Sequence, residues 1–115
     1  MTYTLVNARE MHRKNPESFW APSEMDTMLL GPGDHAKLCF DPVGDEGAMS
    51  ERMWVVITEK TGQHTYRGEL ANQPATMSLE PGDPVEFLSE HIYDYVREQE
   101  ADFEWARRLH ESGRL

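Results

Sequence analysis

The chain has very little cysteine, since Cys39 is the only one among its 115 residues. A single thiol cannot form a disulfide within the chain, and it cannot build a metal site from several cysteines. The sequence shows neither a helix N-terminus nor a paired basic group beside Cys39, so we expect an inert, half-buried thiol rather than a nucleophile. This cysteine usage is typical of a reducing compartment.

Positive charge is scarce too, because 11 Lys and Arg residues stand against 21 Asp and Glu residues and the formal net charge is −10. Binding to a nucleic-acid backbone needs a basic patch, and an acidic chain is repelled by anionic lipid surfaces. We therefore expect neither a nucleic acid nor a membrane as partner. The same charge favours solubility and is compatible with a basic protein partner.

Long apolar runs are missing as well. No stretch approaches the length of a transmembrane helix, and the apolar residues at positions 2–6 form too short a run for a signal peptide. We therefore expect a cytoplasmic protein. Its 115 residues have the length of one domain, which is enough to bury a core without disulfides or metals.

Motifs of recognised chemistry are also lacking. The five histidines form no pair at metal-binding spacing, and Asp45 and Glu46 lack the spacing of a calcium loop. Pro32 stands between two glycines where a phosphate-binding loop needs a backbone N–H, and no G-x-S-x-G segment occurs. We expect no catalytic residue, no metal ligand and no cofactor, and hence no enzyme.

The strongest signal that is present is a β-hairpin at residues 53–74. Residues 53–59 are rich in β-branched and aromatic side chains, Gly62 permits a tight turn, and residues 65–70 alternate between polar and apolar. The first strand is apolar on both faces, and such strands are covered on both sides. We expect the core on one face and a helix or the N-terminal segment over Trp54 on the other.

Further strands are predicted at residues 35–40, 75–79 and 84–88, with a strand or arm at 2–6 and a loop at 41–52. Residues 35–40 alternate, with Ala36, Leu38 and Phe40 expected inward and Lys37 and Cys39 outward or half-covered. Five short strands with tight turns indicate an α+β protein built on a small, strongly bent antiparallel sheet or a partly open SH3-like barrel. The alternative is a flatter antiparallel sheet with helices packed on one face. We expect Phe19 and Trp20 to plug the end of the barrel.

Helices are predicted where a capping residue precedes a helical pattern. Asn7 precedes a helix at 8–14, Ser23 precedes a helical turn through Leu30, and Ser89 precedes a C-terminal helix. One stripe of that last helix carries Ile92, Val96, Phe103 and Ala106. Residues 1–95 would then form the barrel-like domain, and residues 96–115 a helical extension packed on it or on a partner.

The candidate binding surface comprises Trp54, Tyr66, Asn72, Pro74, Trp105 and Leu109. For Trp54 we favour a position in the core over a role as a surface contact. Trp105 lies about 200° around a helix from Phe103, so one flat contact cannot bury both rings. We expect a protein partner or a second copy of the chain to cover Trp105 and Leu109; the sequence does not say whether a small molecule also binds.

Three segments of the chain together resemble an uncharacterised bacterial domain family: MWVVIT (53–58), YRGELANQP (66–74) and PGDPVEF (81–87). That family pairs a W-V strand with a G-x-L-x-N-x-P segment, then a G-D-x-V strand and an H-I helix start, here His91-Ile92. FWAP (19–22) and GDHAKL (33–38) also look like its first half, so the resemblance covers residues 7–95. Similar small domains occur among proposed immunity proteins of toxin systems. The resemblance implies the barrel-like fold and carries over no catalytic residue.

The function that these observations favour is a non-enzymatic binding or interaction protein with an acidic surface. One alternative is an immunity-type inhibitor that masks a basic toxin by charge complementarity. Another is a small ligand-binding domain or enzyme with a cleft near Trp54, Tyr66 and Asn72.

Overall fold

The structure, a computed structural model, describes residues 2–44 and 47–98. Among these residues it contains six strands, two short α-helices and one turn of 3-10 helix. In chain order the elements are β1 (Thr2–Leu5), α1 (Ala8–Lys14), α2 (Glu24–Met28), β2 (His35–Val43), β3 (Glu51–Lys60), β4 (Thr65–Leu70), β5 (Pro84–Leu88), η1 (Ser89–His91) and β6 (Asp94–Val96). No helix of this described part is long and apolar enough to span a membrane.

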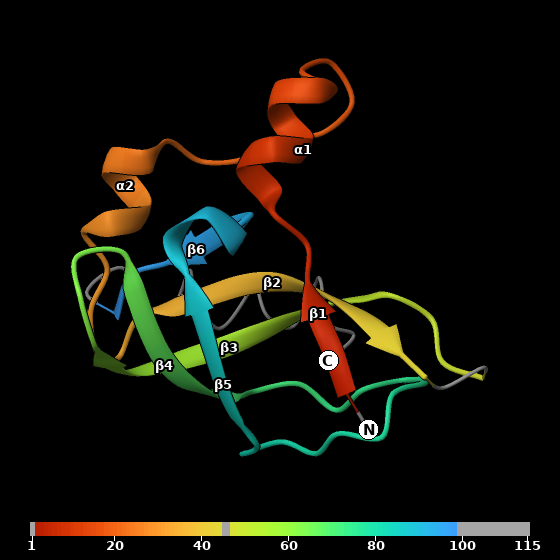
Figure 1. Ribbon diagram of the computed structural model, residues 1–115. Helices are drawn as coiled ribbons and strands as arrows, with labels where there is room; N and C mark the ends of the chain where they lie inside the picture. Colours follow the sequence, from red (N-terminus) through yellow and green to blue (C-terminus); the bar gives the residue numbers. More distant parts are fainter. Residues whose placement is uncertain (1, 45–46, 99–115) are drawn as a thin grey trace.

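The strands form one antiparallel sheet in the order β1-β2-β3-β4-β5, and β6 returns to pair with β2. β3 pairs along one edge of β2. β6 and β1 lie one after the other along the opposite edge, at residues 35–37 and 40–43 of β2. The result is a nearly closed, barrel-like sheet, with α1 and α2 on the same side of it (Figure 1). The predicted α+β class is confirmed at this level.

The core follows the side-chain alternation predicted for β2. Ala36, Leu38 and Phe40 point inward and are fully buried, whereas Lys37 and Cys39 are half-buried on the outer face. The inward residues of β3 meet them across the ladder, together with side chains of β4 and β5. Trp54 is also buried but belongs to the outer face, as expected for a strand covered on both sides.

Both predicted N-terminal helices are present with their caps. Asn7 Oδ1 accepts the N–H of Glu10 at 2.9 Å, and Ser23 Oγ accepts the N–H of Asp26 at 3.2 Å. The phenol of Tyr66 donates to the carbonyl of Thr27 at 2.6 Å, so the buried ring of β4 holds α2 against the barrel.

The strand predicted at residues 75–79 is wrong, because a side chain takes the place of a partner strand. The carboxylate of Glu51 accepts the N–H groups of Ala75, Thr76 and Met77 at 2.7, 2.8 and 3.0 Å. It also accepts the Thr76 hydroxyl at 3.0 Å. The predicted 41–52 loop is shorter than expected, since β2 continues to Val43 and β3 already begins at Glu51.

The helix predicted after Ser89 is also wrong over the described residues. Ser89–His91 is one 3-10 turn, and Asp94–Val96 is a strand that pairs with His35, Ala36 and Lys37. Ile92 and Val96 are buried as expected, but in a turn and a strand, because the free edge of β2 offers backbone partners that local propensity cannot outweigh. The proposed helical positions Phe103, Trp105, Ala106 and Leu109 lie outside the described residues.

Gly68 of β4 lies close against the backbone of β3. A Cβ at this position would lie 2.4 Å from the carbonyl oxygen of Val56 and 2.6 Å from Cγ1 of Val55. We predict that Gly68→Ala lowers the free energy of unfolding by about 2 kcal/mol or more, because backbone must move to admit the methyl group. Gly31→Ala is the matched control, since a Cβ there meets nothing within 4 Å. Equal losses in urea denaturation would contradict the prediction.

Glu51 predicts a pH-dependent contribution to stability. Burial raises the pKa of this carboxyl, but the hydrogen bonds from residues 75–77 outweigh it and leave the pKa below its usual 4.5. The unfolded chain therefore takes up the proton first, so this stabilisation is present above about pH 4.5 and is lost as the pH falls through the lowered pKa.

We predict that Glu51→Gln destabilises the protein by about 1–2 kcal/mol at pH 7, because the charge-assisted hydrogen bonds are lost at a half-buried site. The difference between parent and variant should shrink as the pH falls below 4.5. Denaturant melts at several pH values measure it. A difference that stays the same at every pH would rule out the carboxylate as its source.

Candidate functional site

Four of the residues predicted as a binding surface are buried. Trp54 and Tyr66 are 2% and 1% exposed, and Asn72 and Pro74 are also buried. Asn72 Oδ1 accepts the N–H of Trp54, which ties the turn after β4 to β3. These side chains therefore have structural contacts in the fold, and a role for them in partner binding stays a prediction. Trp105 and Leu109 lie outside the described residues.

Phe19 and Trp20, expected together at the end of the barrel, separate. The Phe19 ring is half-buried with its centroid 5.3 Å from that of Tyr93, whereas Trp20 is 62% exposed. The chain lacks regular structure at these positions, so adjacent side chains need not share a face. Trp20 is therefore not a plug, and the expectation for it is wrong.

Polar side chains gather on the outer face of β2 and β3, opposite the core. Lys37 stands directly across the ladder from Trp54, and Cys39 from Arg52. The segment around Trp20 and the start of β6 border this face and line an open hollow of about 330 Å³. We call this hollow the Arg52 pocket. Its lining residues are Ser18, Phe19, Trp20, Lys37, Arg52, Tyr93 and Asp94.

Arg52 is held by aromatic rings rather than by a carboxylate. Its guanidinium carbon lies 4.7 Å from the ring centroid of Tyr93 and 5.6 Å from that of Phe19, a cation–π arrangement. Lys37 Nζ lies 5.5 Å from the Trp54 centroid. In the described part of the chain neither cation forms a salt bridge, whereas Arg67 pairs with both Glu59 and Glu86.

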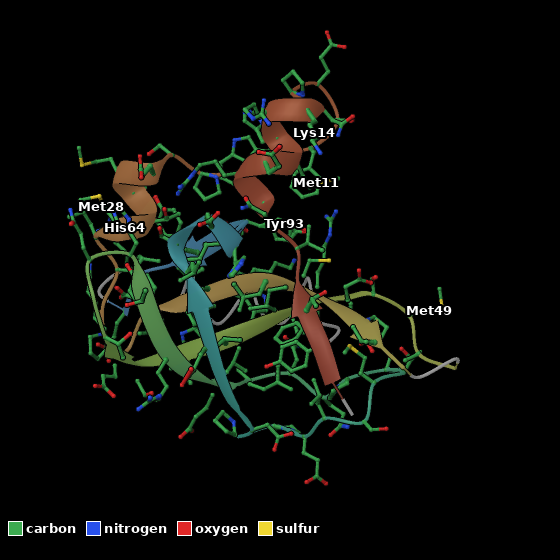
Figure 2. All side chains as sticks on the ribbon, viewed as in Figure 1. Met11, Lys14, Met28, Met49, His64 and Tyr93 are labelled. Carbon is green, nitrogen blue, oxygen red and sulfur yellow. The ribbon has the colours of Figure 1, made fainter. Side chains whose placement is uncertain are left out.

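Tyr93 places a hydrogen-bond donor beside Arg52. Its backbone N–H donates to the carbonyl of Lys37 at 3.0 Å, which fixes the residue where β6 approaches β2. Figure 2 shows Tyr93 between the sheet and α1. The side chain is only 5% exposed, yet its phenol oxygen has no hydrogen-bond partner among the described residues.

The phenol of Tyr93 stays protonated at physiological pH. Burial, and then the neighbouring Cys39, raise its pKa to about 12, against the opposing effect of Arg52. Cys39 and Arg52 are thus close to the phenol, but neither makes a hydrogen bond of ordinary geometry with it. An unpaired buried donor is costly and uncommon, so a bound acceptor at this O–H would stabilise the protein.

The Arg52 pocket presents groups that can contact a ligand, but its described residues include no activated nucleophile. Burial raises the pKa of the Cys39 thiol, although Tyr93 and Arg52 lower it, so the nearest nucleophile is protonated at neutral pH. Asp94 lies opposite Lys37 across the β2–β6 ladder, and its Oδ1 accepts the N–H of Tyr95 at 2.9 Å. Within residues 2–44 and 47–98, no three His, Cys, Asp or Glu side chains are placed to hold a metal ion.

The sequence analysis missed this site. The alternation of residues 35–40 did place Lys37 on the outer face, and Arg52 directly precedes the predicted hairpin strand. What joins them to Tyr93 is the return of β6 to β2, which the predicted C-terminal helix excluded.

Comparisons of the chain with family models, curated proteins and solved structures found no match. The resemblance to the bacterial domain family with the W-V and G-x-L-x-N-x-P segments therefore stays a prediction. Function has to be inferred from the Arg52 pocket itself.

The exposure of Trp20 leads to a stability prediction. Trp20→Ala should lower the free energy of unfolding by less than about 1 kcal/mol, because exposed side chains lose little when truncated. Phe19→Ala should cost about 2 kcal/mol, since this ring packs on Tyr93 and carries Arg52. Urea denaturation of both variants measures the difference. If Trp20→Ala lowers the free energy of unfolding as much as Phe19→Ala does, Trp20 plugs the end of the barrel after all.

Proposed function

We propose that the protein is a binding protein, without catalytic chemistry of its own, that holds an anionic group in the Arg52 pocket. The observation that carries the proposal is the buried phenol O–H of Tyr93, which lies beside the guanidinium of Arg52; among the described residues the phenol has no hydrogen-bond partner and the guanidinium no carboxylate partner. Arginine presents a planar set of donors that matches the oxygens of a carboxylate or phosphate.

The local charge of the pocket supports an anion despite the acidity of the whole chain. Two cations, Lys37 and Arg52, and one carboxylate, Asp94, line it, which leaves one net positive charge. The remainder of the chain repels anions at long range, and salt screens that repulsion beyond roughly 10 Å. Short-range donors in the pocket then decide the affinity.

We further infer that the sheet is an SH3-like barrel. The meander β2-β3-β4-β5, the single 3-10 turn and the return of β6 to β2 support this interpretation. Such small barrels host many unrelated functions, so the fold adds no argument for a particular ligand. A cytoplasmic location is proposed from the single cysteine alone.

A second candidate function is the binding of a basic protein, including the immunity-type inhibition of a toxin. It is favoured by the exposed carboxylates of Glu59, Glu69 and Glu86 on neighbouring strands; among the described residues Glu59 and Glu86 pair with Arg67, and Glu69 forms no salt bridge. An association rate that falls steeply with added salt is the signature of this mode of binding. A rate independent of salt would exclude it.

The proposed function is tested by adding simple anions to the purified protein at constant ionic strength. Acetate, benzoate and phosphate are compared with chloride by thermal denaturation. A ligand at ten times its Kd stabilises the folded state by about 1.4 kcal/mol, which corresponds to a rise in Tm on the order of 5 °C. We predict such a rise with at least one carboxylate or phosphate.

Two variants identify the site of that effect. Arg52→Gln should abolish the rise in Tm. Arg67→Gln should keep it, because this substitution removes the same charge from β4, away from the pocket. If no anion stabilises the parent more than chloride does, or if Arg52→Gln responds as the parent does, the proposed function is wrong.

A further inference from the structure

The aromatic lining of the Arg52 pocket bears on the rest of the ligand. Three rings line the hollow, but Arg52 already lies over those of Phe19 and Tyr93. Trp20 is different, because it is 62% exposed and has no ring or cation contact among the described residues. An open indole at the mouth of a polar hollow is suited to stack on a flat ring.

The charge of the lining selects among anionic groups. One net positive charge is matched by one negative charge, whereas a phosphate ester with about two negative charges would face Asp94 at greater cost. A carboxylate has two oxygens: Arg52 can donate to both of them, and the Tyr93 phenol supplies a further donor. The set of donors therefore fits a monocarboxylate better than a phosphate ester.

The size of the hollow accommodates a small ligand. Its volume of about 330 Å³ is at the small end for ligand pockets. One aromatic ring with its acid group fits within such a volume.

We infer that the Arg52 pocket binds a small aromatic monocarboxylate, with its carboxylate at Arg52 and Tyr93 and its ring on Trp20. This inference rests on the proposed function, because it specifies the ligand of the same pocket. It goes further in requiring a flat ring and a single charge.

The test compares four probes: benzoate, cyclohexanecarboxylate, acetate and phenyl phosphate. Each is titrated into the full-length protein while the indole N–H signals are followed by NMR. We expect benzoate to bind about two- to tenfold more tightly than cyclohexanecarboxylate, the gain expected from one aromatic pair, and more tightly than phenyl phosphate. The Trp20 signal should shift more than that of Trp54, which is buried and not itself part of the lining.

Four variants separate the contributions. Trp20→Leu should reduce benzoate to the affinity of cyclohexanecarboxylate, and Arg52→Gln should weaken every carboxylate. Asp94→Asn should strengthen binding, because it removes the negative charge that the described residues contribute to the lining. Arg67→Gln should change none of the affinities.

The outcomes distinguish this inference from the proposed function. If benzoate and cyclohexanecarboxylate bind equally, or if phenyl phosphate binds more tightly than benzoate, the aromatic monocarboxylate is excluded while an anion site remains. If acetate and benzoate bind but the Trp20 signal does not move, the ring contact is excluded in the same way. If no probe binds, both proposals fail.

Discussion

The structure depends on the alternation of side chains along β2. This strand sends Ala36, Leu38 and Phe40 into the core, and each of them is fully buried. Its backbone serves β3 along one edge and β1 and β6 along the other. A shift of one residue in its register would exchange core and outer faces for the whole strand. The closure of the barrel and the placement of the pocket both follow from that register.

The same register builds the candidate site. The carbonyl group of Lys37 accepts the N–H of Tyr93 at the edge of β2 with which β6 pairs. Across the other edge, the pairing of Cys39 with Arg52 brings the guanidinium over the Tyr93 ring. The pocket thus lies at the seam where the last strand joins the first long one. The pairing of β2 with β3 brings Lys37 near Arg52, and the return of β6 to β2 adds Tyr93 and Asp94.

The sequence predicts the parts of this fold that local chemistry decides. Side-chain alternation identified β2, β-branched residues and Gly62 identified the hairpin, and Asn7 and Ser23 identified the helix starts. The sequence does not predict the structure of segments whose conformation depends on a residue far along the chain. Residues 75–79 have the pattern of a strand, but the Glu51 carboxylate takes their N–H groups. β6 spans three residues, Asp94–Val96, and exists because the edge of β2 is open to it.

The candidate site could not be predicted for the same reason. Trp54 and Tyr66 were predicted as binding residues because they are large aromatic side chains, yet both are buried in the folded chain. The residues that line the pocket carry no motif and are spread from position 18 to position 94. Only the exposure of Trp20 and the unpaired phenol of Tyr93 single them out, and both are properties of the folded chain.

The central claim is that the phenol of Tyr93, which has no hydrogen-bond partner among the described residues, and the guanidinium of Arg52, which has no carboxylate partner among them, together bind a carboxylate. A crystal structure of the protein with benzoate tests it most directly. We predict a carboxylate oxygen about 2.7 Å from the phenol oxygen of Tyr93 and within about 2.9 Å of the guanidinium of Arg52. Benzoate bound elsewhere, or a Tyr93 phenol that donates to a protein atom while the pocket stays empty, would contradict it.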